Sequence, residues 1–374
     1  MIPGGQSTPV TKRQRTWRRV RFVVGVALGG VALWAVSGHG GELAGASSEL
    51  SHLDVGWLLL AIAVEALSLV AFACLDQRLL RCGDVRAGLG RFTVISLATG
   101  AISSSLPAGP LVATAFGFRQ FRRLGASEVL SAWTLLASFV FSSLGLALLA
   151  TAGMVMAERQ GSAFDLIGVI VVILVITIAG ATAVYERRAL ARFLQWTLRA
   201  SHRLIGHPRR PDDNIVSTFA ASMSHVSLDK SDLLSAMTWS IANWALDCGC
   251  LVFSYIAVGA AVPWRGLLLA YGAGQLAANL PITPGGLGVV EGSLVIALVA
   301  FGGAHVSTVA AVLLYRIVSF WGYLPVGWLA WGGLTWHNRR VDKLASLTAE
   351  APALRYVPAP APALAQDQTA ELPE

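Results

Sequence analysis

Long apolar runs separated by short clusters of arginine constrain this chain more than any other feature of its sequence. Windows such as Val55 to Leu75 and Asp165 to Val184 each reach the roughly 20 residues that a helix needs to cross the hydrocarbon core of a bilayer. Charged residues make up only 13% of the chain, against about a quarter in soluble domains. The sequence therefore predicts an all-α integral membrane protein.

Several other classes of protein fit the sequence poorly. The net charge of +7 comes from arginines clustered between apolar runs, which indicates membrane orientation rather than nucleic-acid binding. Four cysteines form neither a disulfide framework nor a zinc site: Cys74, Cys82, Cys248 and Cys250. The sequence has no Walker loop and no His-Glu-x-x-His motif. We therefore expect no enzymatic activity, no cofactor and no metal.

The arginine clusters predict the topology, because loops rich in Lys and Arg remain on the cytoplasmic side. We expect a basic cytoplasmic segment over residues 1–19, a membrane domain of about eight helices over 20–337 beginning with a span near 20–37, and a largely disordered cytoplasmic tail over 338–374. The basic loop 185–232 is cytoplasmic by the same rule. Its apolar spacing indicates either an amphipathic helix lying on anionic inner-leaflet lipids or an ordinary connecting helix.

Proline-containing breaks interrupt two of the apolar runs. Pro107 and Pro110 divide the run from Phe92 to Phe118 into two arms that are too short for two full crossings. A re-entrant hairpin that enters and leaves on the cytoplasmic side satisfies both length and charge. Pro281 and Pro284 divide the run Trp264 to Gly303, which is either a second re-entrant hairpin or a pair of tilted full spans.

The two broken runs resemble each other in sequence. The segments GAISSSLPAGP and GQLAANLPITP match at Gly, Leu, Pro and Pro at a constant offset of 174. One copy enters from inside and the other from outside, so we expect an inverted repeat, with one unit over about 55–153 and the other over about 233–334. Inverted repeats with broken helices are typical of secondary transporters. The half-helix that begins near Leu287 points its positive end at the break, which favours an anion such as phosphate.

The segment LPITPGGLGVVEG, followed by the arginine of LLYRIVSFW, resembles the membrane domain of the lysylphosphatidylglycerol synthase/flippase family. The resemblance covers roughly Val20 to Leu334. It implies a bacterial cell-membrane flippase that moves an anionic or aminoacylated phospholipid, or another lipid-linked phosphate, between leaflets. We expect the phospholipid head group to bind at Asn279, Thr283, Gly285, Gly286, Gly288, Glu291 and Arg316, with Pro284 as part of the same motif.

The chain departs from the family in two respects. Gly117 lies where the repeat offset places the partner of Glu291. The soluble aminoacyl-transferase domain of the full-length synthases is also missing, so we expect no lysyl transfer by this chain and a separate transferase as partner. An alternative function is a non-catalytic membrane partner or scaffold, or a membrane enzyme, in a lipid-modifying or glycolipid pathway.

Four ionisable residues lie deep in predicted spans: Glu65, Asp247, Glu291 and Arg316. Each costs about 2.5 to 3.5 kcal/mol at the centre of a membrane helix, which favours a functional or paired role. The planar fork of Arg316 suits a lipid phosphate, or Arg316 and Glu291 form a structural ion pair. Glu65 and Asp247 either couple transport to protons or make a neutral contact between helices.

Overall fold

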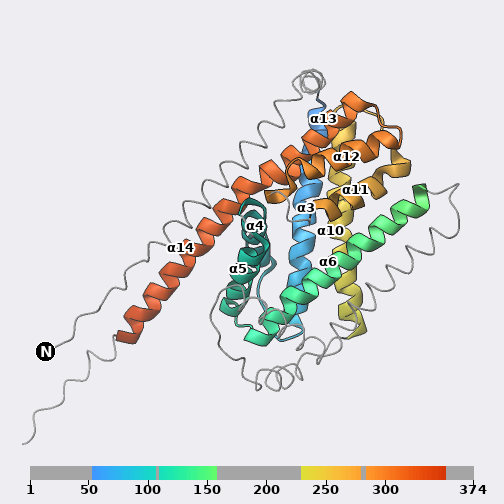
Figure 1. The fold of residues 1–374 in the computed structure, drawn as a ribbon. Helices are drawn as coiled ribbons and strands as arrows, with labels where there is room; N and C mark the ends of the chain where they lie inside the picture. Colours follow the sequence, from blue (N-terminus) through green and yellow to red (C-terminus); the bar gives the residue numbers. More distant parts are fainter. Residues whose placement is uncertain (1–52, 107–108, 158–228, 279–283, 351–374) are drawn as a thin grey trace, which may run out of the picture. The chain divides into compact units, whose positions relative to one another are not determined.

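The computed structural model describes residues 53–106, 109–157, 229–278 and 284–350, and within these ranges the chain forms helices without any strand (Figure 1). The helices are α3 (Val55–Arg81), α4 (Leu89–Ser105), α5 (Gly109–Arg123), α6 (Glu128–Ala157), α10 (Lys230–Ala257), α11 (Trp264–Ala278), α12 (Val289–Ala300), α13 (His305–Arg316) and α14 (Tyr323–Glu350). One unit is Met1–Trp331 and the other is Gly332–Glu374. The expected spans near 20–37 and 164–184, and nearly all of the basic loop, lie outside the described residues.

Four helical segments in the described part of the chain are long and apolar enough to cross a membrane: α3, α6, α10 and the run from His305 to Leu344. The side chain of Asp54 accepts hydrogen bonds from the first amides of α3, and Asp229 and Asp232 form a capping box at the start of α10. Such caps satisfy amides that the start of a helix leaves without partners. The prediction of an all-α membrane protein is confirmed. The predicted number of eight spans stays a prediction, because it includes residues outside the described ranges.

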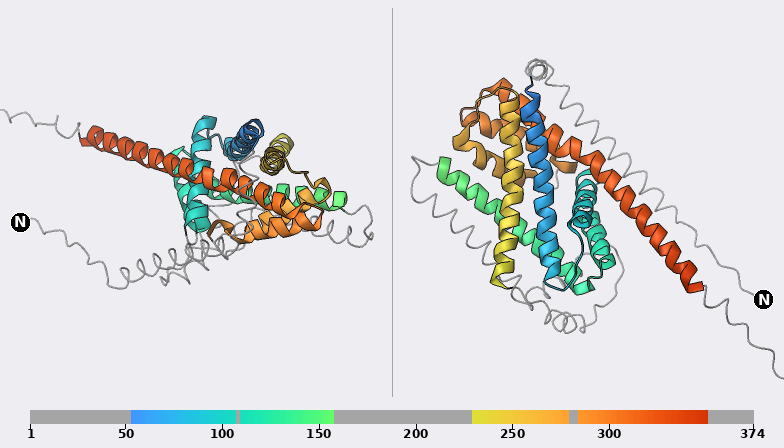
Figure 2. Two further views of the ribbon diagram at one scale, coloured as in Figure 1. Left: turned by 90° about the horizontal axis from the view of Figure 1, so that it is seen from above. Right: turned by 180° about the vertical axis from the view of Figure 1, so that it is seen from behind.

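Helices α3 and α10 lie antiparallel along each other (Figure 2). Three contacts join them along their length: the amide of Asp54 with the carbonyl of Ala257 (3.0 Å), the hydroxyl of Ser68 with the carbonyl of Asn243 (3.0 Å), and the ion pair of Arg78 with Asp232 (2.8 Å). In each pair the two residue numbers add to 310 or 311. Position 65 therefore lies opposite position 246, which brings Glu65 next to Asp247.

Helix α6 packs against both α10 and α3. Ser240 and Trp244 on α10 donate hydrogen bonds to backbone carbonyls of α6 at 2.6 and 2.7 Å. On the other side, the hydroxyl of Ser138 donates to the carboxyl of Asp76 at 2.5 Å. Asp76 is a buried ionisable residue that we did not expect inside a span, since the predicted helix ended at Leu75 whereas α3 continues to Arg81.

Helices α4 and α5 form the first broken hairpin. They have 17 and 15 residues, which correspond to about 26 and 23 Å at 1.5 Å per residue, less than the roughly 30 Å of the hydrocarbon core. The rings of Phe92 in α4 and Phe121 in α5 lie 6.3 Å apart, so the hairpin begins and ends at the same end of the bundle. That end carries Arg78, Arg81, Arg122 and Arg123 in the last turns of α3 and α5.

Helices α11 and α12 form the second broken hairpin. They have 15 and 12 residues, or about 23 and 18 Å, too short for two full spans. The start of α11 lies against the end of α12, because a Cβ atom added at Gly266 would lie 1.9 Å from the ring of Phe301. This hairpin follows α10, which is antiparallel to α3, so the two hairpins enter from opposite ends. Of the two alternatives from the sequence, these short arms favour the re-entrant hairpin, which stays a prediction.

The element starts repeat at an almost constant interval. The starts of α3 and α10, of α4 and α11, and of α5 and the short 3₁₀ turn Pro284–Gly286 each differ by 175 positions, and those of α6 and α13 by 177. These intervals of 175 and 177 positions are close to the predicted offset of 174, so the repeat relates whole helices as well as motif residues. Corresponding helices of opposite direction are the arrangement that an inverted repeat requires.

A π-helical segment, Ile317–Gly322, joins α13 to α14. Pro325 has no N–H group for the carbonyl of Trp321, and a missing α-helical hydrogen bond favours such a widened turn. The first turns of α14 then pack on α4, where Tyr323 donates to the carbonyl of Leu97 at 3.0 Å and Trp328 donates to the hydroxyl of Ser105 at 3.2 Å.

Helix α14 continues to Glu350. Residues 338–350, the start of a tail that we expected to be largely disordered, are therefore helical. The stretch RRVDKLASLTAE contains many good helix formers, and the next proline comes only at Pro352. Residues 351–374 lie outside the described part of the chain.

Candidate functional site

Three glycines in the left-handed conformation make the turn between α11 and α12. Gly285, Gly286 and Gly288 have φ angles of 63°, 69° and 79°, where other residues pay about 1 to 2 kcal/mol. At Gly285 there is also no room for a side chain, since a Cβ atom would lie 2.3 Å from the ring of Phe320 and 3.1 Å from the carbonyl oxygen of Ser104. The backbone itself therefore requires the Gly-Gly-x-Gly pattern.

The same close approach brings the two hairpins together. Ser104 belongs to the last turn of α4, immediately before the first break, whereas Gly285 belongs to the second break. The two breaks thus meet inside the bundle, as the inverted repeat predicts. Backbone polar groups that a break frees at this depth must face protein or a wet cavity.

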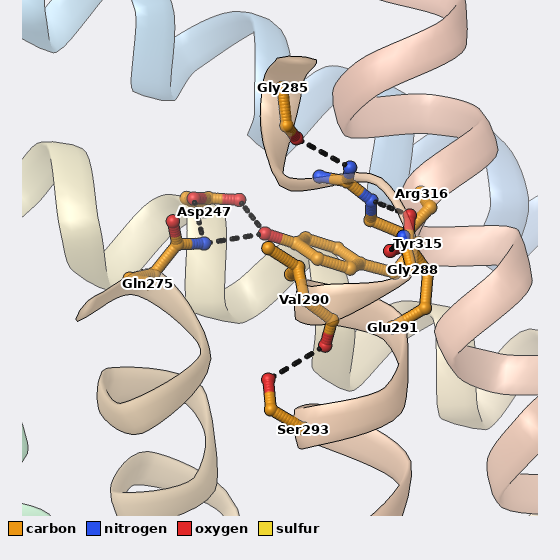
Figure 3. Close-up of polar contacts among 9 residues, drawn as sticks. All are labelled: Asp247, Gln275, Gly285, Gly288, Val290, Glu291, Ser293, Tyr315 and Arg316. Carbon is orange, nitrogen blue, oxygen red and sulfur yellow. Dashed lines mark hydrogen bonds and ion pairs between the residues drawn. The ribbon is translucent and has the colours of Figure 1, made fainter. Parts of the chain in front are cut away.

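Arg316, the last residue of α13, reaches into the second break. Its Nε donates to Oε1 of Glu291 at 2.6 Å, and its Nη2 donates to the carbonyl oxygen of Gly285 at 3.1 Å (Figure 3). The guanidinium also lies over the ring of Phe320, 4.4 Å from the ring centre. The side chains of Arg316 and Glu291 are only 10% and 20% exposed. The ion pair that the sequence left as one alternative is therefore formed.

Glu291 also caps the helix that follows the break. Its Oε2 accepts a hydrogen bond from the amide of Gly288 at 2.7 Å, at the positive end of α12. A carboxylate is favoured there by the helix dipole. One carboxylate thus binds both groups that would attract an anion, the guanidinium and the end of the half-helix. Whether these residues also bind substrate stays a prediction.

A second polar cluster lies beside the ion pair and centres on Asp247 of α10. Its carboxylate accepts hydrogen bonds from the hydroxyl of Tyr271 at 2.6 Å, from the hydroxyl of Tyr315 at 2.9 Å and from the amide of Gln275 at 3.4 Å. The amide of Gln275 also lies 3.0 Å from the hydroxyl of Tyr315. The cluster therefore joins α10, α11 and α13 through polar contacts inside an apolar core.

Glu65 completes this second cluster from α3. Glu65 is 8% exposed, and its carboxyl group interacts with the carboxyl group of Asp247 and with the thiol of Cys250. Its buried oxygen Oε2 has no hydrogen-bond partner within the described ranges. The structure thus brings together two acidic residues that are 182 positions apart in the sequence.

Adjacent residues of α13 link the two clusters. Tyr315 points to Asp247, whereas Arg316 points to the glycine turn and Glu291 (Figure 3). The π-helical segment begins directly after Arg316, and such segments occur frequently at functional sites. A rotation of this one turn of helix would move both contacts together.

The structure places only some of the predicted residues. Pro107, Asn279, Pro281 and Thr283 lie outside the described ranges; Pro284 opens the glycine turn, and Pro110 lies exposed in the first turn of α5. Gly117 is buried in α5, where an added Cβ atom would lie 3.3 Å from the side chain of Leu135 and 3.4 Å from that of Thr99. Tyr271, Gln275 and Tyr315 were not among the predicted site residues. Their signal was present, because Tyr271 and Gln275 are spaced to share one helix face and Tyr315 precedes Arg316.

Two further features concern ligands. A depression of about 530 Å³ lies at the arginine-rich end of the bundle, lined by Arg81, Asp84, Arg86 and Ala87, away from both clusters. Within the described ranges, no group of three His, Cys, Asp or Glu side chains is arranged to hold a metal ion.

Comparison with known proteins agrees with the motif. Residues 22–327 match the family described as "Lysylphosphatidylglycerol synthase TM region". A "UPF0104 membrane protein" of Methanothermobacter thermautotrophicus is 31% identical over 178 residues, which cover 43% of this chain and 50% of that protein. The chain thus spans about half the length of this curated relative.

Proposed function

Because this chain belongs to the lysylphosphatidylglycerol synthase transmembrane-region family, we propose that it is a lipid flippase. Its substrate would be an anionic or aminoacylated phospholipid, or another lipid-linked phosphate, moved between the leaflets of the cell membrane. The arginine-rich end of the bundle faces the cytoplasm in this proposal, with both termini inside. Anionic lipids would contact the basic loop, and a separate transferase would supply an aminoacylated substrate.

One observation carries the proposal: two helix breaks meet at a nearly buried ion pair. The guanidinium of Arg316 and the amide of Gly288 both bind the Glu291 carboxylate, so the site is built to hold an anion. A lipid phosphate presents the same kind of acceptor oxygens to these donors. The carboxylate of Glu291 therefore acts as an internal stand-in for the phosphate.

Exchange of partners gives a mechanism without a covalent step. Removing one member of a buried ion pair leaves an uncompensated charge and is costly, so a lipid that satisfies both Arg316 and Glu291 is favoured. An aminoacylated phospholipid does so, since its phosphate binds Arg316 and its ammonium binds Glu291. Rocking of the two hairpins against each other then alternates access to the two leaflets.

Transport by purified protein in vesicles tests the proposal. The probe is a fluorescent aminoacylated phosphatidylglycerol placed in one leaflet, and translocation is read from its accessibility to an external quencher. Arg316→Gln should reduce the rate to that of protein-free vesicles. Arg78→Gln is the matched control, because Arg78 forms its ion pair with Asp232 at the end of the bundle, and its rate should remain that of the wild type. A double variant, Glu291→Gln with Arg316→Gln, that moves lipid at the wild-type rate would refute the assigned site.

A further inference from the structure

The carboxyl groups of Glu65 and Asp247 interact in the bundle interior, and in the part of the chain that the structure describes neither forms a salt bridge. Glu65 and Asp247 each lie ten residues from the nearer end of a membrane-spanning helix, or about 15 Å at 1.5 Å per residue. Among the described residues, the charge of Arg316 reaches Asp247, but Arg316 forms its ion pair with Glu291. Within the described ranges, the other titratable groups around the pair are Cys248, Cys250, Tyr271, Tyr315 and Tyr323.

Two carboxyl groups at such close range do not both ionise in a poorly solvated site, and they share one proton instead. The hydrogen bonds favour a negative charge on Asp247 rather than on Glu65. Asp247 accepts from Tyr271, Tyr315 and Gln275, as a carboxylate does, because such an anion is an acceptor only. Glu65 has a buried oxygen with no partner in the described part of the chain, which suits a neutral acid.

We propose that Glu65 and Asp247 form a binding site for a single exchangeable proton, carried by Glu65, which couples lipid transport to a pH gradient. The coupling half of this inference rests on the proposed flippase function. Loss of the proton would place a second negative charge beside Asp247 and loosen the contact between α3 and α10. Because Tyr315 bonds Asp247 and the next residue is Arg316, the disturbance would reach the lipid site through one turn of α13.

Infrared spectroscopy of the purified protein in lipid nanodiscs tests the proton site without any transport. The wild type should show the C=O stretching band of a protonated carboxylic acid near neutral pH, and this band should shift in D₂O. Glu65→Gln should remove this component. Asp76→Asn is the matched control, since Asp76 is a buried carboxyl of the same helix bonded to Ser138, and the Glu65 component should persist in it. A difference spectrum between wild type and Glu65→Gln without a protonated-acid band would overturn the proposal.

Transport under a pH gradient tests the coupling, with the membrane potential clamped by potassium and valinomycin. For one proton per lipid, a gradient of one pH unit sustains up to about a tenfold ratio of probe lipid between leaflets. Asp76→Asn should keep this ratio and Glu65→Gln should reduce it to about one, with an unchanged melting temperature. A tenfold ratio in Glu65→Gln would overturn the coupling. If the wild type moves no lipid at all, the flippase function fails, and the infrared result alone confirms or overturns the proton site.

Discussion

Replacing either member of the Arg316–Glu291 pair with glutamine should lower the stability of the protein by more than replacing both. In Arg316→Gln, the Glu291 carboxylate keeps its bond to the amide of Gly288 but loses its counter-ion. In Glu291→Gln, the guanidinium keeps the carbonyl of Gly285 and the ring of Phe320 but loses the carboxylate. Each single change therefore leaves one charge unpaired in a site that is mostly shielded from water.

The magnitude follows from the burial of the pair. Removing one partner of a buried ion pair costs about 3 to 5 kcal/mol, and side-chain exposures of 10% and 20% place this pair near the lower limit, at about 3 kcal/mol. The double variant leaves no unpaired charge, so we expect it to lose about 1 to 2 kcal/mol. The coupling energy from the double-mutant cycle should then be about 4 to 5 kcal/mol.

The assay is reversible unfolding of purified protein in mixed micelles, followed by tryptophan fluorescence. The Arg78–Asp232 pair provides the control cycle, because its side chains are 35% and 17% exposed and such pairs contribute about 1 kcal/mol or less. A coupling energy below about 0.5 kcal/mol for Arg316 and Glu291, the error limit for independent sites, would refute the reasoning. It would mean that the two charges are separately solvated rather than joined.

Three further predictions concern the turn, the second cluster and the topology. Gly285→Ala should lower the free energy of unfolding by at least about 1 to 2 kcal/mol, from its left-handed φ alone. Gly292→Ala, in open space within α12, should raise the free energy of unfolding by about 0.5 to 1 kcal/mol. Equal effects of the two changes in unfolding experiments would contradict this account. Tyr315→Phe removes one donor to Asp247 and should cost about 1 to 3 kcal/mol, and a stability unchanged in the same assay would show that the bond contributes nothing. Cysteines are introduced at the exposed positions Arg86 and Ala304 in a variant without Cys74 and Cys82. They should react with an impermeant reagent from opposite sides of the membrane, the cysteine at position 304 from outside. Labelling of both from one side would refute the orientation.

The sequence predicted the elements whose signal is local. The positions of proline and glycine predicted both breaks, and the length of each arm predicted the first re-entrant hairpin. The pairing of Glu65 with Asp247 was not predictable in the same way, because it depends on the register of α3 against α10, which is set by contacts such as that of Ser68 with Asn243. The ends of α3 and α14 were not predictable either. No proline or glycine directly follows Asp76 or Leu334 to mark where the helix stops.

The π-helical segment after Arg316 divides one long helix into two parts whose buried faces contact different partners. A single residue inserted into an α-helical ladder rotates everything beyond it by about 100°, since an α-helix has 3.6 residues per turn. Upstream of the segment, Tyr315 faces the Asp247 cluster; downstream, Tyr323 and Gly327 face α4. In a regular α-helix these downstream residues would be out of phase with α4 and would turn toward lipid. The π-helical segment therefore sets the rotation of the helix, so that the part before it contacts the polar core and the part after it contacts the first hairpin.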